Sequence, residues 1–288
     1  MIFTKNQSLG DTVFSVAVYF VLGLIAAIVL YPLIYIFSSS FSSPNAVIQG
    51  RVWLWPVDIS FEGYRAVFAS KNIWSGYGNT IFYAVVGTSV NVSMTLIAAY
   101  PLSRSDFKAR NAVMLLFAFT MFFGGGMIPS YLLVKDLGLI NTRAAMIVPG
   151  AMSVWNVIIT RTYYQSDIPS ELWEVAQIDG CSHTLFFTRV VLPLSKAIIA
   201  INILFYSVGH WNDFMGALLY INESSKYPLQ LILREILIQN QIDSNITNNV
   251  ADIEYRSRIQ ALLKYSVIVV SSLPVLAAYP FVQKYFVR

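Results

Sequence analysis

Long uncharged, apolar runs alternate along the chain with short segments that hold the charged residues. The first run covers residues 13–37, and five more lie at 79–103, 111–134, 144–160, 197–211 and 265–283. The hydrocarbon core of a bilayer is about 30 Å thick and a helix rises about 1.5 Å per residue, so roughly 20 apolar residues cross it. The pattern therefore predicts an all-α polytopic membrane protein with six transmembrane helices.

The composition supports this fold class. Hydrophobic residues make up 56% of the chain and charged residues 12%. The charged share of a typical soluble domain is about 25%. The apolar runs also lack the alternation of apolar and polar positions that marks a transmembrane β-barrel. These properties exclude a soluble domain, favour helices over a barrel, and give no reason to expect a nucleic-acid partner.

Charge near the predicted spans indicates their orientation. Residues 1–12 are expected to form a short N-terminal segment before a single transmembrane domain over residues 13–288, and an even number of spans places both termini on one side. Total Lys and Arg counts on the two sides are nearly equal, but short loops report orientation better than long ones. The loop at 104–110 carries three cations against one anion, and Lys284 and Arg288 lie near the C-terminus. Both termini are therefore predicted to be cytoplasmic.

The predicted spans lack the groups that several kinds of membrane protein need. None contains an ionisable residue at mid-depth, and His210, near the end of the fifth, is the closest exception. This disfavours proton-coupled transporters and intramembrane hydrolases. A Walker A loop needs Gly directly before its Lys, and no lysine here has one. A single cysteine, Cys181, excludes a disulfide within the chain. We expect no catalytic site, metal or bound cofactor, so any energy that the protein uses must come from elsewhere.

The polar segment at 167–193 separates the fourth and fifth spans and predicts two short helices. Ser170 is an eligible N-cap for the first helix. Leu172, Val175 and Ala176 follow at helical spacing and predict one small apolar ridge. Helices this short gain their stability from packing, so the ridge suits insertion into a cleft on another protein.

A glycine, a serine and a proline predict where these helices meet and end. Gly180 can adopt the left-handed conformation that terminates the first helix. Ser182 can cap a second helix that runs through Phe186 and Phe187. Pro193 is expected to stop that helix, so that the chain turns into the fifth span.

Acidic residues distinguish two interpretations of the first helix. An amphipathic helix resting on the membrane surface is the commoner outcome for a loop of this kind. Glu171, Glu174 and Asp179 have no cation among them, whereas membrane-surface helices are normally rich in Lys and Arg. The carboxylates therefore favour pairing with basic residues of a partner protein.

The same segment resembles the inner-membrane permease subunits of ATP-binding-cassette (ABC) importers. The hallmark loop of that family is Glu-Ala-Ala, three residues and Gly, followed about nine residues later by an apolar residue and Leu-Pro. Here it reads Glu174-Val175-Ala176-Gln177-Ile178-Asp179-Gly180, then Val191-Leu192-Pro193. Val175 replaces one Ala on the apolar ridge, and the Glu, Gly and Pro positions are intact.

The likeness covers nearly the whole chain and is strongest to the carbohydrate-uptake group, as the maltose-type second permease. The runs 123–129 and 137–142 are similar to members assigned to oligosaccharide, polysaccharide or lipo-oligosaccharide uptake. The resemblance implies a multi-pass protein of the bacterial plasma (inner) membrane, in contact with lipid. This protein would form half of a pore and couple ATPase motion to alternating access of that pore.

The resemblance also implies several partners. These are a second homologous permease, two cytoplasmic ATP-binding subunits that use ATP and Mg, an extracytoplasmic solute-binding protein, and the carbohydrate. Residues 167–193 would be the cytoplasmic coupling loop. Glu174 would pair with a basic residue of the ATPase, Gly180 would allow the bend, and Leu192 and Pro193 would complete the motif.

Candidates for sugar contact are harder to place from sequence. Sugar sites combine flat aromatic faces with amide or hydroxyl groups. Such side chains in or beside the spans are Tyr83, Asn91, Asn156, Tyr206, Trp211 and Asn212. Each has a structural alternative, because Tyr and Trp anchor helices at the membrane interface and Asn joins helices.

Two further alternatives stay open. The run Gly124–Gly126 permits either close helix packing or a mobile gate. A secondary sugar transporter acting alone, or a membrane scaffold, competes with the importer subunit as the function. Co-purification with an ATPase would separate these classes.

Overall fold

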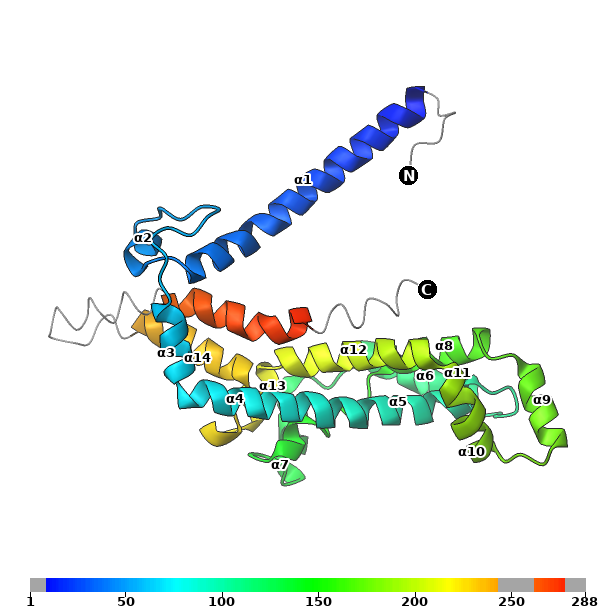
Figure 1. Ribbon diagram of the computed structural model, residues 1–288. Coiled ribbons are helices and arrows are strands. Elements are labelled where there is room, and N and C mark those ends of the chain that lie inside the picture. The colour runs from blue at the N-terminus through cyan, green and yellow to red at the C-terminus, as the bar shows by residue number, and fades with distance from the viewer. Residues whose placement is uncertain (1–8, 243–261, 278–288) are drawn as a thin grey trace. The chain divides into compact units, whose positions relative to one another are not determined.

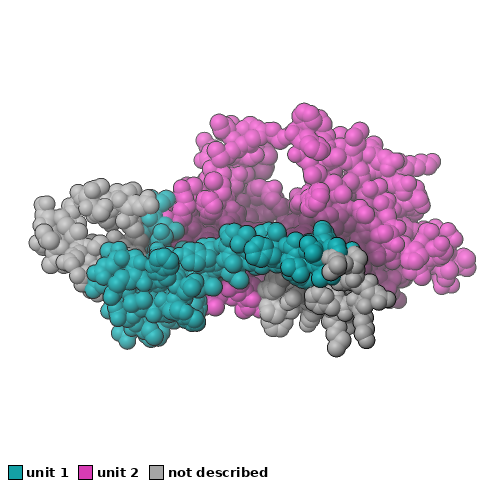
Figure 2. Space-filling view, turned by 90° about the horizontal axis from the view of Figure 1, so that it is seen from above, with its two compact units in different colours: residues 1–70, 236–272 teal, residues 71–235, 273–288 magenta. Residues whose placement is uncertain are grey.

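The computed structural model describes residues 9–242 and 262–277, and every regular element in these ranges is a helix (Figure 1). Two compact units divide the chain, and Figure 2 colours them separately. The first comprises residues 1–70 and 236–272, and the second comprises residues 71–235 and 273–288.

The first unit contains α1 (Leu9–Ser40), α2 (Pro44–Ile48), α3 (Glu62–Ala69) and most of the helix Leu262–Ala277. α1 includes the predicted first span, and its apolar side chains are exposed around the helix. A small core forms beyond its C-terminal end, where Ala46, Val47 and Leu262 are buried together. A helix that is apolar on all sides requires cover from lipid or another chain, so α1 has the properties of a membrane span.

The second unit holds the remaining elements, in which α denotes an α-helix and η a π-helix or 3₁₀-helix. They are α4 (Lys71–Phe82), η1 (Tyr83–Gly87), α5 (Thr88–Ser103), α6 (Arg110–Phe122), α7 (Met127–Asp136), η2 (Arg143–Met146), α8 (Val154–Ser166), α9 (Ser170–Ile178), α10 (His183–Phe186), η3 (Phe187–Val191), α11 (Leu192–Leu194), α12 (Lys196–Asn212), α13 (Met215–Tyr220), η4 (Ser224–Lys226) and the start of α14 (Leu229–Ile242).

The predicted second span lies within one long helical rod. α4, η1 and α5 follow one another without a break over Lys71–Ser103, a length of 33 residues. At about 1.5 Å per residue the rod is roughly 50 Å long, more than the ~30 Å hydrocarbon core requires. α5 packs chiefly against α8 and α12 (Figure 1). These three helices form the frame that positions the 167–193 segment.

The predicted third span over 111–134 is not one continuous helix. α6 ends at Phe122, α7 begins at Met127, and the two helices are bent by 114°. Gly126 has φ of 86°, a left-handed conformation that side chains other than Gly rarely adopt. The three consecutive glycines therefore break the helix.

The predicted fourth span over 144–160 is also displaced. Residues Arg143–Met146 form a single 3₁₀ turn, and α8 begins only at Val154 and continues to Ser166. Pro149 and Gly150 lie between these elements. Proline lacks a backbone donor and disfavours helix in the residue before it, so the apolar run cannot be one helix from its start.

The fifth and last predicted spans correspond to helices. α12 covers Lys196–Asn212, within one residue of the predicted 197–211 at each end. The last, at 265–283, overlaps the helix Leu262–Ala277, and its residues 278–283 lie outside the described residues. Over the described ranges, two helices are long and apolar enough to cross a membrane alone, and up to four if each bent pair is one span. The total of six stays a prediction.

Candidate functional site

The site begins where the chain leaves α8 and enters α9. Pro169, with φ of −56° and ψ of 140°, occupies the N-cap position. Ser170 is the first helical residue and its side chain makes no capping bond, so the predicted role of Ser170 as the cap is wrong. Proline fixes the extended entry instead, and Glu171 lies in the first turn as expected.

The inner face of α9 is fastened by an aromatic stack. Trp173 is only 7% exposed, and its ring lies against that of His183 with centroids 4.2 Å apart and 21° between the planes. Phe186 meets the same indole edge-on at 5.1 Å. The guanidinium of Arg104, beyond the end of α5, lies 5.5 Å from the Trp173 ring. Burial of an indole between aromatic and cationic neighbours stabilises the position of α9.

The outer face of α9 remains open. Leu172 is 39% exposed, Val175 58% and Ile178 86%. Ala176 packs inward against the buried cluster around Trp173, so its predicted place on the ridge is wrong. The exposed apolar positions are spaced by three residues and lie along one side of the helix. The ridge therefore consists of Leu172, Val175 and Ile178.

Carboxylates border this ridge. Glu171, Glu174 and Asp179 are all exposed. Within the part of the chain that the structure describes, no hydrogen bond or ion pair engages any of these carboxylates. A surface with both an apolar ridge and unpaired negative charge is chemically suited to a basic partner with an apolar cleft.

The bend after α9 follows the prediction. Gly180 has φ of 73°, the left-handed conformation that ends helices. The Cys181 amide then donates to the carbonyl of Ala176 at 2.8 Å, which closes the turn. The Ser182 hydroxyl accepts a bond from the Leu185 amide at 3.3 Å and caps α10. Gly180 and Ser182 therefore have the predicted backbone roles.

Pro193 does not end the second helix, contrary to prediction. α10, the π-helix η3 and α11 follow one another through Leu192 and Pro193 as far as Leu194, and the break comes at Ser195. The path then bends by 80° into α12. Pro193 is the second residue of α11 and lies near the C-terminal end of this continuous helical path. The wider π turn just before it accommodates the ring.

Side chains connect the 167–193 segment to the end of α5, and α5 to α8. His183 Nε2 lies 3.6 Å from the carboxylate of Asp106, and the Tyr100 hydroxyl is 3.4 Å from His183 Nδ1. Arg161 of α8 donates from Nε to the carbonyl of Leu102 at 2.8 Å, which joins α8 to the end of α5. A force on α9 therefore reaches α5 and α8 through side chains that are already in contact.

Two of the sugar candidates lie between helices. The Asn91 amide donates to the carbonyl of Gly150, and its Oδ1 lies 2.7 Å from His210 Nε2. The Tyr206 hydroxyl is 2.6 Å from the Thr95 hydroxyl. Both candidates are buried, so in this chain they join helices.

The candidates farther along the chain differ in exposure. Asn156 is 5% exposed and Trp211 8%, and the Trp211 ring contacts Tyr77 at 6.3 Å. Asn212 is exposed, and its amide donates to the carbonyl of Val208 at 3.0 Å. A sugar-binding role for these residues stays a prediction.

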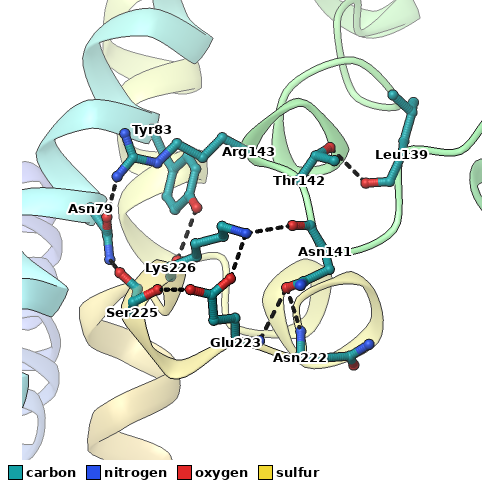
Figure 3. A network of polar contacts seen from close by, with 10 residues as sticks. All are labelled: Asn79, Tyr83, Leu139, Asn141, Thr142, Arg143, Asn222, Glu223, Ser225 and Lys226. Carbon is teal, nitrogen blue, oxygen red and sulfur yellow. Dashed lines mark hydrogen bonds and ion pairs between the residues drawn. The ribbon is translucent and has the colours of Figure 1, made fainter.

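The sixth candidate, Tyr83, belongs to a polar network on the N-terminal half of the rod (Figure 3). Its hydroxyl donates to the Lys226 carbonyl at 2.9 Å. The Asn79 amide donates to the Ser225 carbonyl at 2.7 Å, and Arg143 Nη2 donates to Asn79 Oδ1 at 3.2 Å. These bonds hold two loops against the rod: the one that contains Arg143 and the one that contains Ser225 and Lys226.

The two loops also bind each other directly (Figure 3). Asn141 has φ of 60°, and its Oδ1 accepts bonds from the amides of Asn222 and Glu223 at 3.2 and 3.1 Å. Lys226 Nζ donates to the Asn141 carbonyl and pairs with Glu223 at 2.7 Å. The hydrogen bond from Lys226 is the main reason why the pKa of Glu223 is below its usual value.

The family described as "Binding-protein-dependent transport system inner membrane component" matches residues 91–288, which is more than half of the chain. The chain belongs to this family. The match confirms the resemblance predicted from the 167–193 segment. The chain is thus an integral inner-membrane permease, and ATP hydrolysis belongs to separate subunits.

Individual relatives match over nearly their whole length. The permease is 41% identical over 287 residues to Protein LplC of Bacillus subtilis (strain 168), covering 100% of this chain and 96% of that protein. It is 39% identical over 279 residues to the Polygalacturonan/rhamnogalacturonan transport system permease protein YtcP of the same strain, covering 96% of each.

A solved structure shows the same fold. It is described as a crystal structure of a bacterial ABC transporter involved in the import of the acidic polysaccharide alginate. The matching chain has a TM-score of 0.89 and 36% identity, with 98% of this permease and 100% of that chain covered. The helical architecture of the permease is therefore that of an ABC importer subunit.

Sequence reasoning missed the residues that hold the 167–193 segment in place. Trp173, His183 and Arg104 form its aromatic and cationic anchor in this permease. One signal was available, because Trp carries a large apolar surface and is highly buried on average in folded proteins. The contacts of Arg104 had no such signal, since they join positions distant in sequence.

Proposed function

We propose that this permease forms half of the translocation pore of an ABC importer for an oligo- or polysaccharide. The substrate class is supported by two relatives that match nearly the whole chain. One is described by its transport of polygalacturonan and rhamnogalacturonan, and the other belongs to an alginate importer. The likeness to the alginate importer chain extends over 98% of this permease at 36% identity, well beyond the 167–193 segment.

The importer contains further subunits in this proposal. They are a second homologous permease, two cytoplasmic ATP-binding subunits, and an extracytoplasmic solute-binding protein. ATP and Mg are used by the ATP-binding subunits. The permease crosses the membrane six times with both termini in the cytoplasm, so the 167–193 segment faces the ATPase as the coupling loop.

The observation that carries the mechanism is the two-sided construction of α9. Its inner side is fixed by Trp173, while its outer side offers Leu172 and Val175 beside the unpaired carboxylate of Glu174. The apolar ridge enters a cleft on the ATPase and Glu174 pairs with a basic residue there. When the ATPase dimer closes on ATP, the coupling loop moves with it and shifts the long helices between inward-open and outward-open arrangements.

The break at Gly124–Gly126 belongs to the pore or to a subunit contact in this proposal. Non-helical backbone does not face lipid in the hydrocarbon region, because its polar groups would lack partners there. The residues from Met121 to Ser130 are all exposed in the isolated chain. A water-filled path or the second permease would satisfy the backbone groups at the break.

Substitution of Glu174 tests the coupling role. In the reconstituted importer, Glu174→Ala is expected to reduce ATP-driven uptake by about tenfold, the effect of losing roughly 1.4 kcal/mol at a central contact. Val175→Asp, which places charge on the ridge, should also reduce ATPase retention during purification. Glu62→Ala is the matched control, since Glu62 is an exposed acid in the first turn of α3.

Two results would overturn the proposal. One is normal uptake and normal ATPase retention in both α9 variants. The other is sugar uptake by the permease alone in vesicles under an ion gradient, which would make it a secondary transporter.

A further inference from the structure

A cavity of about 730 Å³ lies beside the 167–193 segment. Its walls come from the end of α5, the loop that follows, and α10 with η3. The residues that matter most are Ile97, Tyr100, Arg104, Phe107, His183 and Phe187. The volume falls within the range of about 300–1,000 Å³ that is typical of small-molecule sites.

One end of the cavity carries a guanidinium that has no carboxylate partner in the described part of the chain. Arg104 lines the cavity, and the buried Nε of this side chain has no hydrogen-bond partner within the described residues. No carboxylate in the described part of the chain lies within ion-pair distance of Arg104, and Asp106, which lines the same cavity, lies 3.6 Å from His183 Nε2. Guanidinium groups favour acceptors with several oxygens, above all carboxylates and phosphates.

The net charge of the loop that carries Arg104 also favours an anion. The loop at 104–110 contains Lys108 and Arg110 as well as Arg104, against the single carboxylate of Asp106. Asp106 opposes an anionic ligand, but the loop remains net positive. Thr184 adds a hydroxyl to the cavity wall.

The other end of the cavity continues into an apolar strip. Ile97 lines the cavity and is 61% exposed. Met94 and Val90 lie three and seven residues before it on α5, with exposures of 46% and 36%. Such spacing places the three side chains on one face of the helix. The strip runs along a membrane span, away from the charged end.

We propose that this cavity binds an anionic phospholipid, with the phosphate at Arg104 and Thr184 and an acyl chain along Ile97, Met94 and Val90. A free anion would use the charged end alone, whereas a lipid uses both ends. The bound headgroup contacts the same guanidinium that packs on Trp173, so the lipid steadies the anchor of α9. The proposal rests on the proposed function in one respect, which is that this end of α5 faces the cytoplasmic leaflet.

Lipid binding to the purified importer complex tests the proposal by native mass spectrometry. Phosphatidylglycerol, phosphatidylcholine and inorganic phosphate are the probes. Phosphatidylglycerol is expected to bind more tightly than phosphatidylcholine, and inorganic phosphate should not displace it. Arg104→Gln should weaken phosphatidylglycerol binding by about tenfold, as expected for a charge-assisted phosphate contact. Asp106→Asn should strengthen it, because a repelling carboxylate is removed.

Further variants keep the result interpretable. Ile97→Asn alters an exposed side chain outside the aromatic stack and should weaken lipid binding even if Arg104→Gln fails to fold. Lys135→Gln is the control, since Lys135 is exposed on α7 and does not line the cavity. Glu174→Ala removes the proposed ATPase contact and should leave lipid binding intact in the isolated permease, which separates failure of this proposal from failure of the coupling role.

Three outcomes would overturn the proposal. Equal binding of phosphatidylcholine would mean that the charged end is not used. Displacement by inorganic phosphate would indicate a site for a free anion. Binding to the isolated permease that disappears in the complex would show that another subunit covers the cavity.

Discussion

The indole of Trp173 lies nearly parallel to the imidazole of His183, with ring centroids 4.2 Å apart. This contact joins α9 to α10 across the bend at Gly180. Neither helix is long enough to be stable alone. Because the stack joins them, the two short helices form one rigid unit. In the proposed coupling role, the 167–193 segment can therefore transmit displacement instead of deforming locally.

Removal of the indole should loosen this rigid unit. Trp173→Ala is expected to lower the free energy of unfolding by about 3–5 kcal/mol, the usual cost of deleting a buried Trp side chain. Thermal unfolding of the purified permease in detergent measures the effect. Trp155→Ala is the control, because Trp155 is 57% exposed and loses little packing within the chain. Equal destabilisation by both substitutions would contradict an anchoring role for Trp173.

The bend depends on backbone conformation at Gly180. Gly180→Ala places a Cβ at φ of 73° and should destabilise the loop by about 1–2 kcal/mol, whereas Asn should be tolerated better. The control is Gly78→Ala in α4, where an added Cβ meets nothing within 4 Å. That change should stabilise the helix by up to about 1 kcal/mol. Unfolding temperatures of the three variants test the expected order, and a neutral Gly180→Ala would refute it.

The close approach of η1 and α12 requires glycine at position 87. A Cβ on Gly87 would collide with the ring of His210. Gly87→Ala is expected to cost about 1–3 kcal/mol, as overpacking does in well-packed cores. Adding His210→Ala should recover part of the loss, and a double-mutant cycle of unfolding free energies measures the coupling. Gly209→Ala, with nothing within 4 Å of its new Cβ, should have little effect.

The ion pair between Glu223 and Lys226 should give a pH dependence. The pKa of Glu223 is lowered chiefly by the hydrogen bond from Lys226, so its contribution to stability is present above the ordinary carboxyl pKa of 4.5. That contribution is lost as the pH falls through the lowered value. The thermal stability of the wild-type permease should therefore drop more steeply below about pH 4.5 than that of Glu223→Gln. Parallel profiles would show that the pair does not stabilise the loop.

Much of the backbone of the 167–193 segment was predictable from local sequence. Gly180 and Ser182 have the predicted backbone roles, because turn and cap chemistry depends on a few neighbouring residues. The N-cap at Ser170 and the helix end at Pro193 were predicted incorrectly for related reasons. Proline can begin a helix as well as end one, and nearby sequence alone did not reveal which applied.

The sequence by itself determined the membrane-protein class, the family and the position of the polar 167–193 segment, because hydropathy and motif spacing are properties of the linear chain. Only the tertiary structure decided that Ala176 faces inward, that Asn91 joins His210, and that Arg104 lies between an aromatic stack and a cavity. These contacts connect residues separated by up to 119 positions. Such pairs are set by how helices pack against one another, and packing depends on the whole surface of each helix.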